Sequence, residues 1–373
     1  MNARAQADST RFAGRARVVA RALRHRIVAR RRKARLPQRI LVVHHLLLGD
    51  TLMLTALLAK LREQHPAADI VMGLPEAYAS LYAKRPYGVR AIGWNVRAPQ
   101  SSKLWLERGF DLALVPGDNR FSWLAMALDA RWIIAFGGDR PANKSWAVDE
   151  LRPYPDAPAA WADIVTTLID GPFPARYLRS QWPDPPGSPF DWPTRHYAVL
   201  HVGASTPLKQ WDPACWRDLA AWLSERGIEP VWSAGRGEEA VAQACIEHTS
   251  PRSYAGVLSL PQLWHLVANA SLLVAPDTGV AHLGRIVGTP TVALFGPGSS
   301  LISGAGEFWR DAPYRAVTVA DFPCRDQRVL FKRELSWVRR CGRSLAECPH
   351  PRCMDAIGLD AVTAAIADLG VAR

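Results

Sequence analysis

Three polar residues lie where an α/β protein can bind a ligand. Asp277 and Thr278 follow an apolar, strand-like run at residues 270–275, and His282 stands in the helical pattern of residues 281–288. A second strand-like run comes directly after the helix, so this order predicts one βαβ unit with a polar loop after its first strand. The free N–H groups and the dipole of a helix start suit a phosphate at that position. The simplest alternative is that Asp277 and Thr278 only cap the helix.

A similar polar loop follows the strand-like run of residues 197–202. It contains Ser205, Thr206 and Lys209. A lysine at this position can pair with a phosphate oxygen as a compact charge, and the two hydroxyls can donate hydrogen bonds to the same group. The alternative is a lysine that only faces solvent.

Asp50 stands in a third loop of this kind. It follows Gly49, between a strand-like run at residues 39–44 and a helical pattern predicted for residues 51–64. On sequence alone, an aspartate at this position suits the N-cap of the helix. An isolated aspartate has a pKa near 4, so its environment must change before it can act as a base at neutral pH.

The elements around these loops fall into two halves. Strand and helix patterns alternate from residue 39 to about residue 136 and start again at residue 197. Seven prolines within residues 172–193 exclude a regular element there and mark a linker. We therefore predict two Rossmann-like α/β domains, residues 37–171 and 194–357, that face each other across a deep cleft. A final helix is expected within residues 358–373.

The composition is that of an ordinary globular protein of 373 residues, with 49% hydrophobic and 21% charged residues. No apolar run reaches the ~18–20 residues that a membrane-spanning helix needs. The start of the chain lacks the apolar core of a secretory signal. Six cysteines in so long a chain do not suggest a disulfide scaffold, so we expect a reducing cytoplasm.

The excess positive charge is confined to an N-terminal arm. Residues 1–39 contain 13 of the 46 Lys and Arg residues and one acid, whereas residues 40–373 contain 33 basic and 33 acidic residues. The net charge of +12 therefore describes the arm and gives no reason to expect nucleic acid as a partner.

The arm itself, residues 1–36, carries an apolar stripe at helical spacing among its arginines. This pattern predicts a basic amphipathic helix that binds an anionic membrane surface. A disordered, solvated tail and an organelle transit peptide are the alternatives. The stripe consists of Phe12, Ala16, Val19, Ala20, Leu23 and Ile27.

Four of the cysteines fall late in the chain, at Cys324, Cys341, Cys348 and Cys353. Their number suits a tetrahedral metal site, but no two are spaced as Cys-x-x-Cys. We favour structural thiols in a packed C-terminal segment over a metal site, which stays the alternative.

Several short blocks, which together cover most of residues 39–300, follow one another in a specific order. Each block is weak alone, but the ordered set resembles glycosyltransferase family 9, the bacterial heptosyltransferases of lipopolysaccharide core synthesis. The blocks are residues 40–43, 48–50 and 54–57; 201–205, 209–211 and 216; 234–239; 254–256 and 258–260; and 277–279, 282–283 and 288–297.

The resemblance implies a GT-B fold, in which the N-terminal domain binds the acceptor and the C-terminal domain binds the nucleotide sugar. It implies an inverting, metal-independent transfer of a heptose, or a related sugar, from an ADP-sugar donor to lipopolysaccharide core or another lipid-linked glycan. No cofactor is implied. Such an enzyme works in the cytoplasm, peripheral to the inner membrane. As in similar transferases, the final helix is expected to close back over the first domain.

The same resemblance gives the catalytic candidates their roles. Asp50 matches the family's proposed general base, which takes the proton of the acceptor hydroxyl. Lys209, with Ser205 and Thr206 beside it, would stabilise the departing diphosphate.

The remaining candidates would bind the donor. Thr278 and Gly279 would hold the diphosphate at the helix start, and Asp277 would accept hydrogen bonds from sugar hydroxyls. His282 would contact phosphate or sugar, unless it is a structural histidine. Glu238 or Glu239 would bind ribose hydroxyls, although both also suit the start of a helix.

Two departures from the family pattern leave the acceptor and the donor sugar open. Residues 44–48 read His-His-Leu-Leu-Leu where the family usually has a small polar residue, and Pro276 precedes Asp277. A nicotinamide oxidoreductase would need a Gly-x-Gly-x-x-Gly turn after the first strand, which the chain lacks. A catalytically inactive sugar- or lipid-binding protein of the same fold is the other alternative, and the joint presence of Asp50, Lys209 and Asp277 argues against it.

Overall fold

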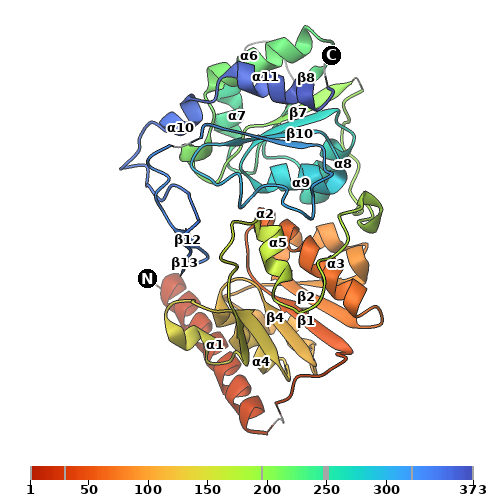
Figure 1. Cartoon of the computed structure of the whole chain (residues 1–373), viewed down its shortest axis with the longest axis vertical. Coiled ribbons are helices and arrows are strands. Elements are labelled where there is room, and N and C mark those ends of the chain that lie inside the picture. The colour runs from red at the N-terminus through yellow and green to blue at the C-terminus, as the bar shows by residue number, and fades with distance from the viewer. Residues whose placement is uncertain (1, 29–30, 195, 247–251, 321, 372–373) are drawn as a thin grey trace.

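The structure, a computed structural model, describes residues 2–28, 31–194, 196–246, 252–320 and 322–371, with side chains from Gly14 onward. Two α/β domains lie one above the other in Figure 1, and each is built on its own parallel sheet. This is the predicted GT-B arrangement of two Rossmann-like domains that face a central cleft. Within the described ranges, no helix is long and apolar enough to cross a membrane.

The first domain is organised on a six-stranded parallel sheet of order β3-β2-β1-β4-β5-β6. Its central strand β1 is buried because helices cover both faces of the sheet. Helix α5 (Trp161–Thr166) and the short β6 were not predicted from the sequence. The strands are β1 (Arg39–Val43), β2 (Asp69–Pro75), β3 (Arg90–Trp94), β4 (Leu112–Val115), β5 (Ile133–Phe136) and β6 (Glu150–Arg152).

The helix predicted for residues 51–64 is in fact two helices. α2 (Leu48–Met53) begins three residues earlier than predicted, and α3 (Thr55–Gln64) follows after a break at Leu54. Asp50 therefore lies in the first turn of α2 and is not its N-cap, which is Leu47. A leucine side chain cannot accept a capping hydrogen bond, so no side chain of the N-cap residue binds the first backbone N–H groups of α2.

The second domain is organised on a five-stranded parallel sheet of order β11-β10-β9-β7-β8. The predicted βαβ unit is present as β9, α9 and β10, and β9 pairs with β10 in parallel. The strands are β7 (Tyr197–His201), β8 (Glu229–Ser233), β9 (Leu272–Pro276), β10 (Thr291–Phe295) and β11 (Tyr314–Thr318). The helices are α6 (Pro213–Ser224), α7 (Glu239–Cys245), α8 (Leu260–Ala268) and α9 (Gly279–Val287).

The proline-rich residues 172–193 contain a single 3-10 turn, Arg179–Gln181, and no other helix or strand. Trp182 is fully buried in this segment. Its indole N–H donates to the Leu81 carbonyl of the first domain at 3.2 Å, and its ring lies 5.6 Å from that of Trp264 in the second. The segment thus contacts both domains.

The last helix, α11 (Leu359–Asp368), does not close over the first domain, so that expectation is wrong. Its apolar residues Val362 and Ile366 are buried in the core of the second domain, against α6, β10 and β11 (Figure 1). The short α10 (Arg352–Asp355) precedes it on the same domain. The face of the second sheet that α11 covers would otherwise be exposed, which explains this position.

A different segment reaches the first domain from the second. Residues 322–350, which we call the strap, leave the second sheet after β11 and carry the small antiparallel pair β12 (Val329–Leu330) and β13 (Arg333–Glu334) (Figure 1). The side chain of Arg333 is only 2% exposed and donates to the carbonyl of Gly137 at 2.7 Å and to Asn119 Oδ1 at 2.8 Å. The strap is therefore fixed in the first domain.

The N-terminal arm contains the predicted helix, α1 (Asn2–Val28), which lies along α4 (Ser122–Ala127) of the first domain (Figure 1). The face that packs is not the predicted apolar stripe, because Val18 and Ala22 contact the domain core instead. Arg31, which follows the helix, binds Asp149 through two hydrogen bonds, one of them 2.7 Å long.

The stripe itself points away from the domain. Val19, Leu23 and Ile27 are 40%, 45% and 84% exposed. Phe12 lies outside the described side chains. The arm thus presents an apolar surface on the side of α1 opposite to its docking face.

Candidate active site

A cavity of about 670 Å³ opens between the two domains. Its walls include the loops that follow β1, β7, β8 and β9, at the edge where open parallel sheets bind ligands. The structure brings every predicted site residue to this one cavity: Asp50, Ser205, Thr206, Lys209, Glu238, Asp277, Thr278, Gly279 and His282.

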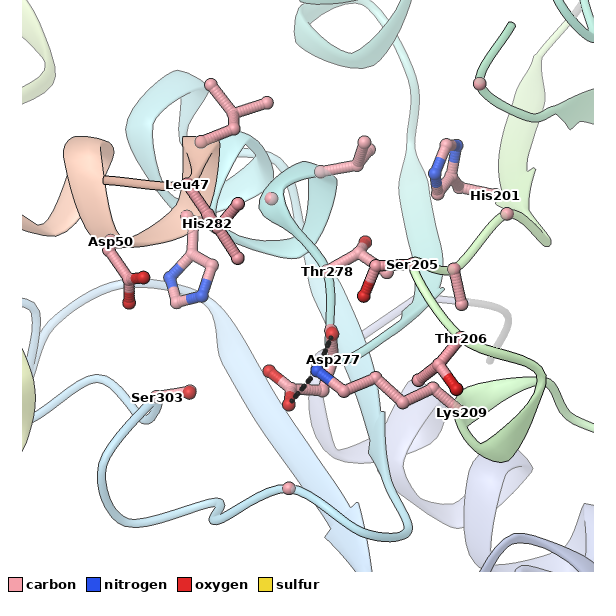
Figure 2. Close-up of a pocket in the computed structure, with 18 of the residues that line it drawn as sticks. Leu47, Asp50, His201, Ser205, Thr206, Lys209, Asp277, Thr278, His282 and Ser303 are labelled. Carbon is pink, nitrogen blue, oxygen red and sulfur yellow. Dashed lines mark hydrogen bonds and ion pairs between the residues drawn. The ribbon is translucent and has the colours of Figure 1, made fainter. Parts of the chain in front are cut away.

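Lys209 and Asp277 form an ion pair in the second domain. The Lys209 ammonium donates to Asp277 Oδ2 at 2.8 Å and to the Asp277 carbonyl at 2.9 Å. Figure 2 shows this pair on the cavity wall, where the loop after β7 meets the loop after β9. The lysine is therefore not a solvated surface residue, and the pair fixes a positive group next to the start of α9.

Thr278 is the N-cap residue of α9, yet its side chain makes no capping hydrogen bond. Its Oγ1 is buried and has no hydrogen-bond partner among the described residues. A buried hydroxyl without a partner is costly, so this atom is available to donate a hydrogen bond to a ligand at the start of α9. The capping role that the sequence allowed for Asp277 and Thr278 is not what the structure shows, because neither side chain caps α9.

Asp50 faces the same cavity from the first domain (Figure 2). Among the described residues, none forms a hydrogen bond or an ion pair with the Asp50 carboxylate. Burial and the negative charge of Asp277 raise the pKa of Asp50 to about 7, although Lys209 and Arg340 act in the opposite direction. A carboxylate with such a pKa can accept a proton near neutral pH, which the ordinary value near 4 does not allow.

His282 is buried in α9 and held in one protonation state. Arg285, one turn further along the helix, donates to its Nδ1. Burial and the nearby positive charges of Arg285 and Lys209 lower the pKa of His282 well below its usual value, so the ring is neutral. Because Nδ1 is the acceptor, Nε2 carries the proton and can donate into the cavity.

Arg285 itself holds this part of the site in place. It is buried, donates to the carbonyls of Ser303 and Gly304, and lies over the Tyr314 ring at 4.6 Å. Arg285 was not among the predicted site residues, although its spacing of three residues from His282 on one helix places the two on the same face.

Two glycines let the two helix starts meet across the cleft. A Cβ atom on Gly49 would lie 2.6 Å from His282 Cδ2, and a Cβ on Gly279 would lie 2.8 Å from the Leu48 side chain. Both distances are too short for a real contact. Gly279, predicted to bind diphosphate, therefore also makes the close approach of α9 to α2 possible.

Glu238 and Glu239, which the sequence could not separate, take different positions. Glu238 lines the cavity and accepts a hydrogen bond from the backbone N–H of Gly235 at 2.7 Å. Glu239 is exposed, binds the N–H of Gly237 and does not line the cavity. Of these two glutamates, only Glu238 faces the cavity.

His201 and Arg340 also line the cavity but were not predicted as site residues. His201 ends β7, and its Nδ1 lies 3.1 Å from the Ser233 hydroxyl. Burial lowers the pKa of His201 to about 4, so it is neutral. Arg340 comes from the strap, which no local sequence pattern connects to the cleft.

The four late cysteines line a separate cavity of about 210 Å³ at the base of the strap. Burial, together with the nearby Cys324 and Cys341, raises the pKa of the Cys353 thiol against the effect of Arg325. Cys353 is therefore held as a thiol. In the part of the chain that the structure covers, no group of three or more His, Cys, Asp or Glu side chains is arranged to hold a metal ion.

Comparison with known proteins adds a family to this geometry. The sequence model of glycosyltransferase family 9 (heptosyltransferase) matches residues 107–305, just over half of the chain. Lipopolysaccharide heptosyltransferase 1 of Pseudomonas aeruginosa is 27% identical over 339 residues, which span 79% of this chain and 92% of the relative. The lipopolysaccharide core heptosyltransferase of Haemophilus influenzae is 21% identical, over 82% of this chain and 91% of the relative.

Solved structures show the same fold. The ADP-heptose lps heptosyltransferase II of E. coli superposes with a TM-score of 0.67 at 18% identity and covers 89% of this chain and 98% of its own. The E. coli heptosyltransferase WaaC with ADP gives a TM-score of 0.62 at 18% identity, over 89% and 99% of the two chains.

Proposed function

The chain belongs to glycosyltransferase family 9, and from this premise we propose that it transfers a heptose, or a related sugar, from an ADP-sugar to lipopolysaccharide core or another lipid-linked glycan. The names of its relatives support the sugar and the acceptor, and the ADP in a solved relative supports the nucleotide. The observation that carries the chemistry is that one cavity joins an unpaired, proton-accepting carboxylate, Asp50, to a positive group, Lys209, from the opposite domain.

In the proposed reaction, Asp50 takes the proton of the acceptor hydroxyl as its oxygen attacks the anomeric carbon of the donor sugar. The bond from that carbon to the phosphate oxygen breaks, and the nucleoside diphosphate leaves with the bonding electrons. A single displacement of this kind inverts the anomeric configuration. We assign the acceptor to the domain of residues 37–171 and the donor to that of residues 194–357, with residues 172–193 as the linker and 358–373 as the C-terminal helix.

Positive charge must stabilise the departing diphosphate. We assign this role to Lys209 and to the N-terminus of α9, where Thr278 Oγ1 and the backbone after it would donate to phosphate oxygens. The reaction would then need no metal ion and no cofactor. Ser205 and Thr206 line the same end of the cavity, Glu238 would accept from a ribose hydroxyl, and the Nε2–H of His282 would donate to phosphate or sugar.

These assignments are tested with the purified protein and a panel of nucleotide sugars, including ADP-heptose. Release of nucleoside diphosphate in the presence of lipopolysaccharide core acceptor is the readout, with the anomeric configuration of the product determined by NMR. We expect release only with an ADP-sugar, and a product of inverted configuration. A retained configuration, or release that does not depend on the acceptor, contradicts the proposal.

We also propose that the arm holds the enzyme at an anionic membrane surface on the cytoplasmic side. Beside the exposed stripe, α1 and its continuation form a hollow of about 1130 Å³ lined by arginines. Arg17, Arg24 and Arg32 in this hollow have no hydrogen bond or ion pair with any described side chain. Apolar burial and ~1 kcal/mol per arginine near an anionic membrane would act together.

Because α1 also packs on the first domain, removing it is a blunt test of membrane binding. A variant with Val19, Leu23 and Ile27 changed to Ser keeps the docking face and removes only the exposed stripe. We expect it to fold normally and to lose most of its affinity for vesicles that contain anionic lipid, as would a protein starting at Leu36. Binding by the parent should fall with rising salt. Equal vesicle binding by all three proteins at low salt would show that the arm has no role at the membrane.

A further inference from the structure

The strap carries the cation of Arg340 from the second domain to the part of the cleft that contains Asp50, the proposed general base. It enters the first domain at β12 and β13, where Arg333 is buried and Phe331 lies against Trp161 with ring centres 4.4 Å apart. On its return it forms a backbone bridge between Gln327 and Arg340. The chain at Arg340 is therefore positioned by contacts on both sides of the cleft.

The next residue, Cys341, joins the strap to the loop that follows β10. The backbone N–H of Cys341 donates to the carbonyl of Pro297 at 2.9 Å, and Pro297 belongs to the loop that follows β10 and also lines the central cavity. Arg340 thus lies close to the point where the strap meets the loop that follows β10, and it lines the cavity between the domains.

The side chain of Arg340 has no hydrogen-bond or ion-pair partner among the residues that the structure describes. It lines the cavity together with Asp50, and no described residue accepts a hydrogen bond from its guanidinium. Its neighbours on the strap differ. Arg339 donates to the carbonyls of Ser336 and Val338, and Arg343 makes two hydrogen bonds to Asp326.

Arg340 and the groups proposed to bind the donor phosphates line the same cavity but come from different segments of the chain. The donor end already has Lys209 and the start of α9 as its positive groups. The charge of Arg340 acts on Asp50, whereas Lys209 acts on both Asp50 and His282. A guanidinium with five free donors beside the general base matches a carboxylate or phosphate that arrives with the acceptor.

We infer that Arg340 binds an anionic group, a carboxylate or a phosphate, on the acceptor sugar next to the attacking hydroxyl, and so selects acidic acceptors. This inference rests on the proposed transfer to a lipid-linked glycan and assigns the strap a substrate-selecting role. The base and the selecting cation then come from different domains, so an acceptor is aligned only when the strap is in place.

The test compares three acceptors with one set of variants. The acceptors are lipopolysaccharide core oligosaccharide in its native form, with its carboxylates reduced to alcohols, and with its phosphates removed. The variants are Arg340→Ala, Arg340→Lys and the matched control Arg339→Ala. Steady-state transfer is measured on each acceptor, and ADP binding is titrated separately.

On the native acceptor, Arg340→Ala should lower kcat/KM by ~10–150-fold, the range for one charge-assisted hydrogen-bonded pair, while ADP binding stays within about twofold. Removing the anion that Arg340 reads should cost the parent the same factor and make Arg340→Ala harmless, and the reduced and dephosphorylated acceptors show which anion it is. Arg340→Lys should lose less than Arg340→Ala, and Arg339→Ala should match the parent throughout.

Equal losses by Arg340→Ala on all three acceptors, or weakened ADP binding, would overturn the inference. If the alanine variant does not fold, Arg340→Lys must still discriminate less between native and modified acceptor than the parent, or the inference is wrong. Direct titration of the native oligosaccharide onto the protein keeps this test separate from the proposed function. Absent transfer by the parent refutes the function, whereas Arg340-dependent binding of the acidic acceptor still supports the role of Arg340.

Discussion

The two ends of the cleft differ in how their charges are matched. At the donor end, Lys209 is already bound to Asp277 by side chain and backbone. At the acceptor end, Asp50 and Arg340 line the cavity without a hydrogen-bond partner among the described residues. The proposed donor end therefore contains a formed ion pair, whereas the proposed acceptor end presents two charged groups that no described residue binds.

This difference explains why the two aspartates of the cleft have different roles. The negative charge of Asp277 is balanced locally, and it also disfavours ionisation of Asp50 across the cleft. Burial and the charge of Asp277 raise the pKa of Asp50, so its carboxylate can take a proton near neutral pH. An ion pair at the proposed donor end and an unpaired carboxylate at the proposed acceptor end suit a transferase that uses a general base.

The largest effect is expected for the substitution Asp50→Asn. The substitution keeps the size of the side chain and removes its basicity, so turnover should fall by ~10²–10⁴ while ADP binding and the fold stay intact. Turnover of the correctly folded variant is measured at saturating donor and acceptor. Near-normal turnover would remove Asp50 from the role of base.

The pH dependence tests the same residue without a mutation. Because the base must be deprotonated and its pKa is raised to about 7, kcat should rise about tenfold per pH unit below pH 7 and level off above it. An aspartate with its ordinary pKa would give a flat profile from pH 5 upward. A flat profile in this range would show that Asp50 has no raised pKa in the substrate complex.

A second substitution, Lys209→Ala, acts at the donor end. It removes one charge-assisted contact worth ~1.5–3 kcal/mol, so ADP should bind ~10–150-fold more weakly. The exposed Lys332→Ala on the strap serves as the control and should bind ADP normally. EDTA should leave the activity of the parent intact if Lys209 and the α9 terminus stabilise the leaving group. Loss of activity on chelation, restored by Mg²⁺ or Mn²⁺, would refute that assignment.

A smaller effect is expected for Glu238→Gln, which weakens one acceptor for a ribose hydroxyl. The affinity for ADP should fall by ~2–10-fold, as for one ordinary hydrogen bond. The matched control is Glu239→Gln, because Glu239 lies outside the cavity and should leave binding unchanged. If both variants bind ADP like the parent, the ribose contact is made elsewhere.

The comparison also shows what sequence could and could not predict. The apolar runs and polar loops predicted both parallel sheets, and all candidates except Glu239 line one cavity, because loops after parallel strands share one edge. The start of α2 was misplaced because Leu48 and Gly49 carry no capping signal. The predicted position of α11 was wrong because a family resemblance cannot show which face of a sheet is left uncovered.

Other features depend on distances that no local pattern contains. Arg340 lines the same cavity as Asp50 from a position 290 residues later in the chain, on a strap held by Arg333. The docking face of α1 was also missed, since both faces of that helix carry apolar residues and the packing partner decides which one is buried. Tertiary contacts, and not propensity, determine both outcomes.

The smallest effect is expected for the free energy of unfolding, through the raised pKa of Asp50. In the folded state the pKa of Asp50 is about 7, above its ordinary value of 3.8, so between these values the folded protein binds more protons than the unfolded chain. The free energy of unfolding of the parent should therefore decrease as the pH rises from about 4 to about 7. Asp50→Asn lacks this ionisation and should be the more stable protein at pH 8.

One pKa unit corresponds to about 1.36 kcal/mol, and solvent access to Asp50 reduces the effect, so a gain of ~1–2 kcal/mol at pH 8 is expected. The difference should vanish below about pH 3, where Asp50 of the parent is protonated in both the folded and the unfolded state. Denaturant unfolding of parent and variant at both pH values measures it, and Asp277→Asn provides the contrast. Because Asp277 is bound to Lys209, its removal strands a cation and should destabilise the protein. If Asp50→Asn is less stable than the parent at pH 8, the carboxylate of Asp50 stabilises the fold as that of Asp277 does. The contrast between the two aspartates would then be wrong.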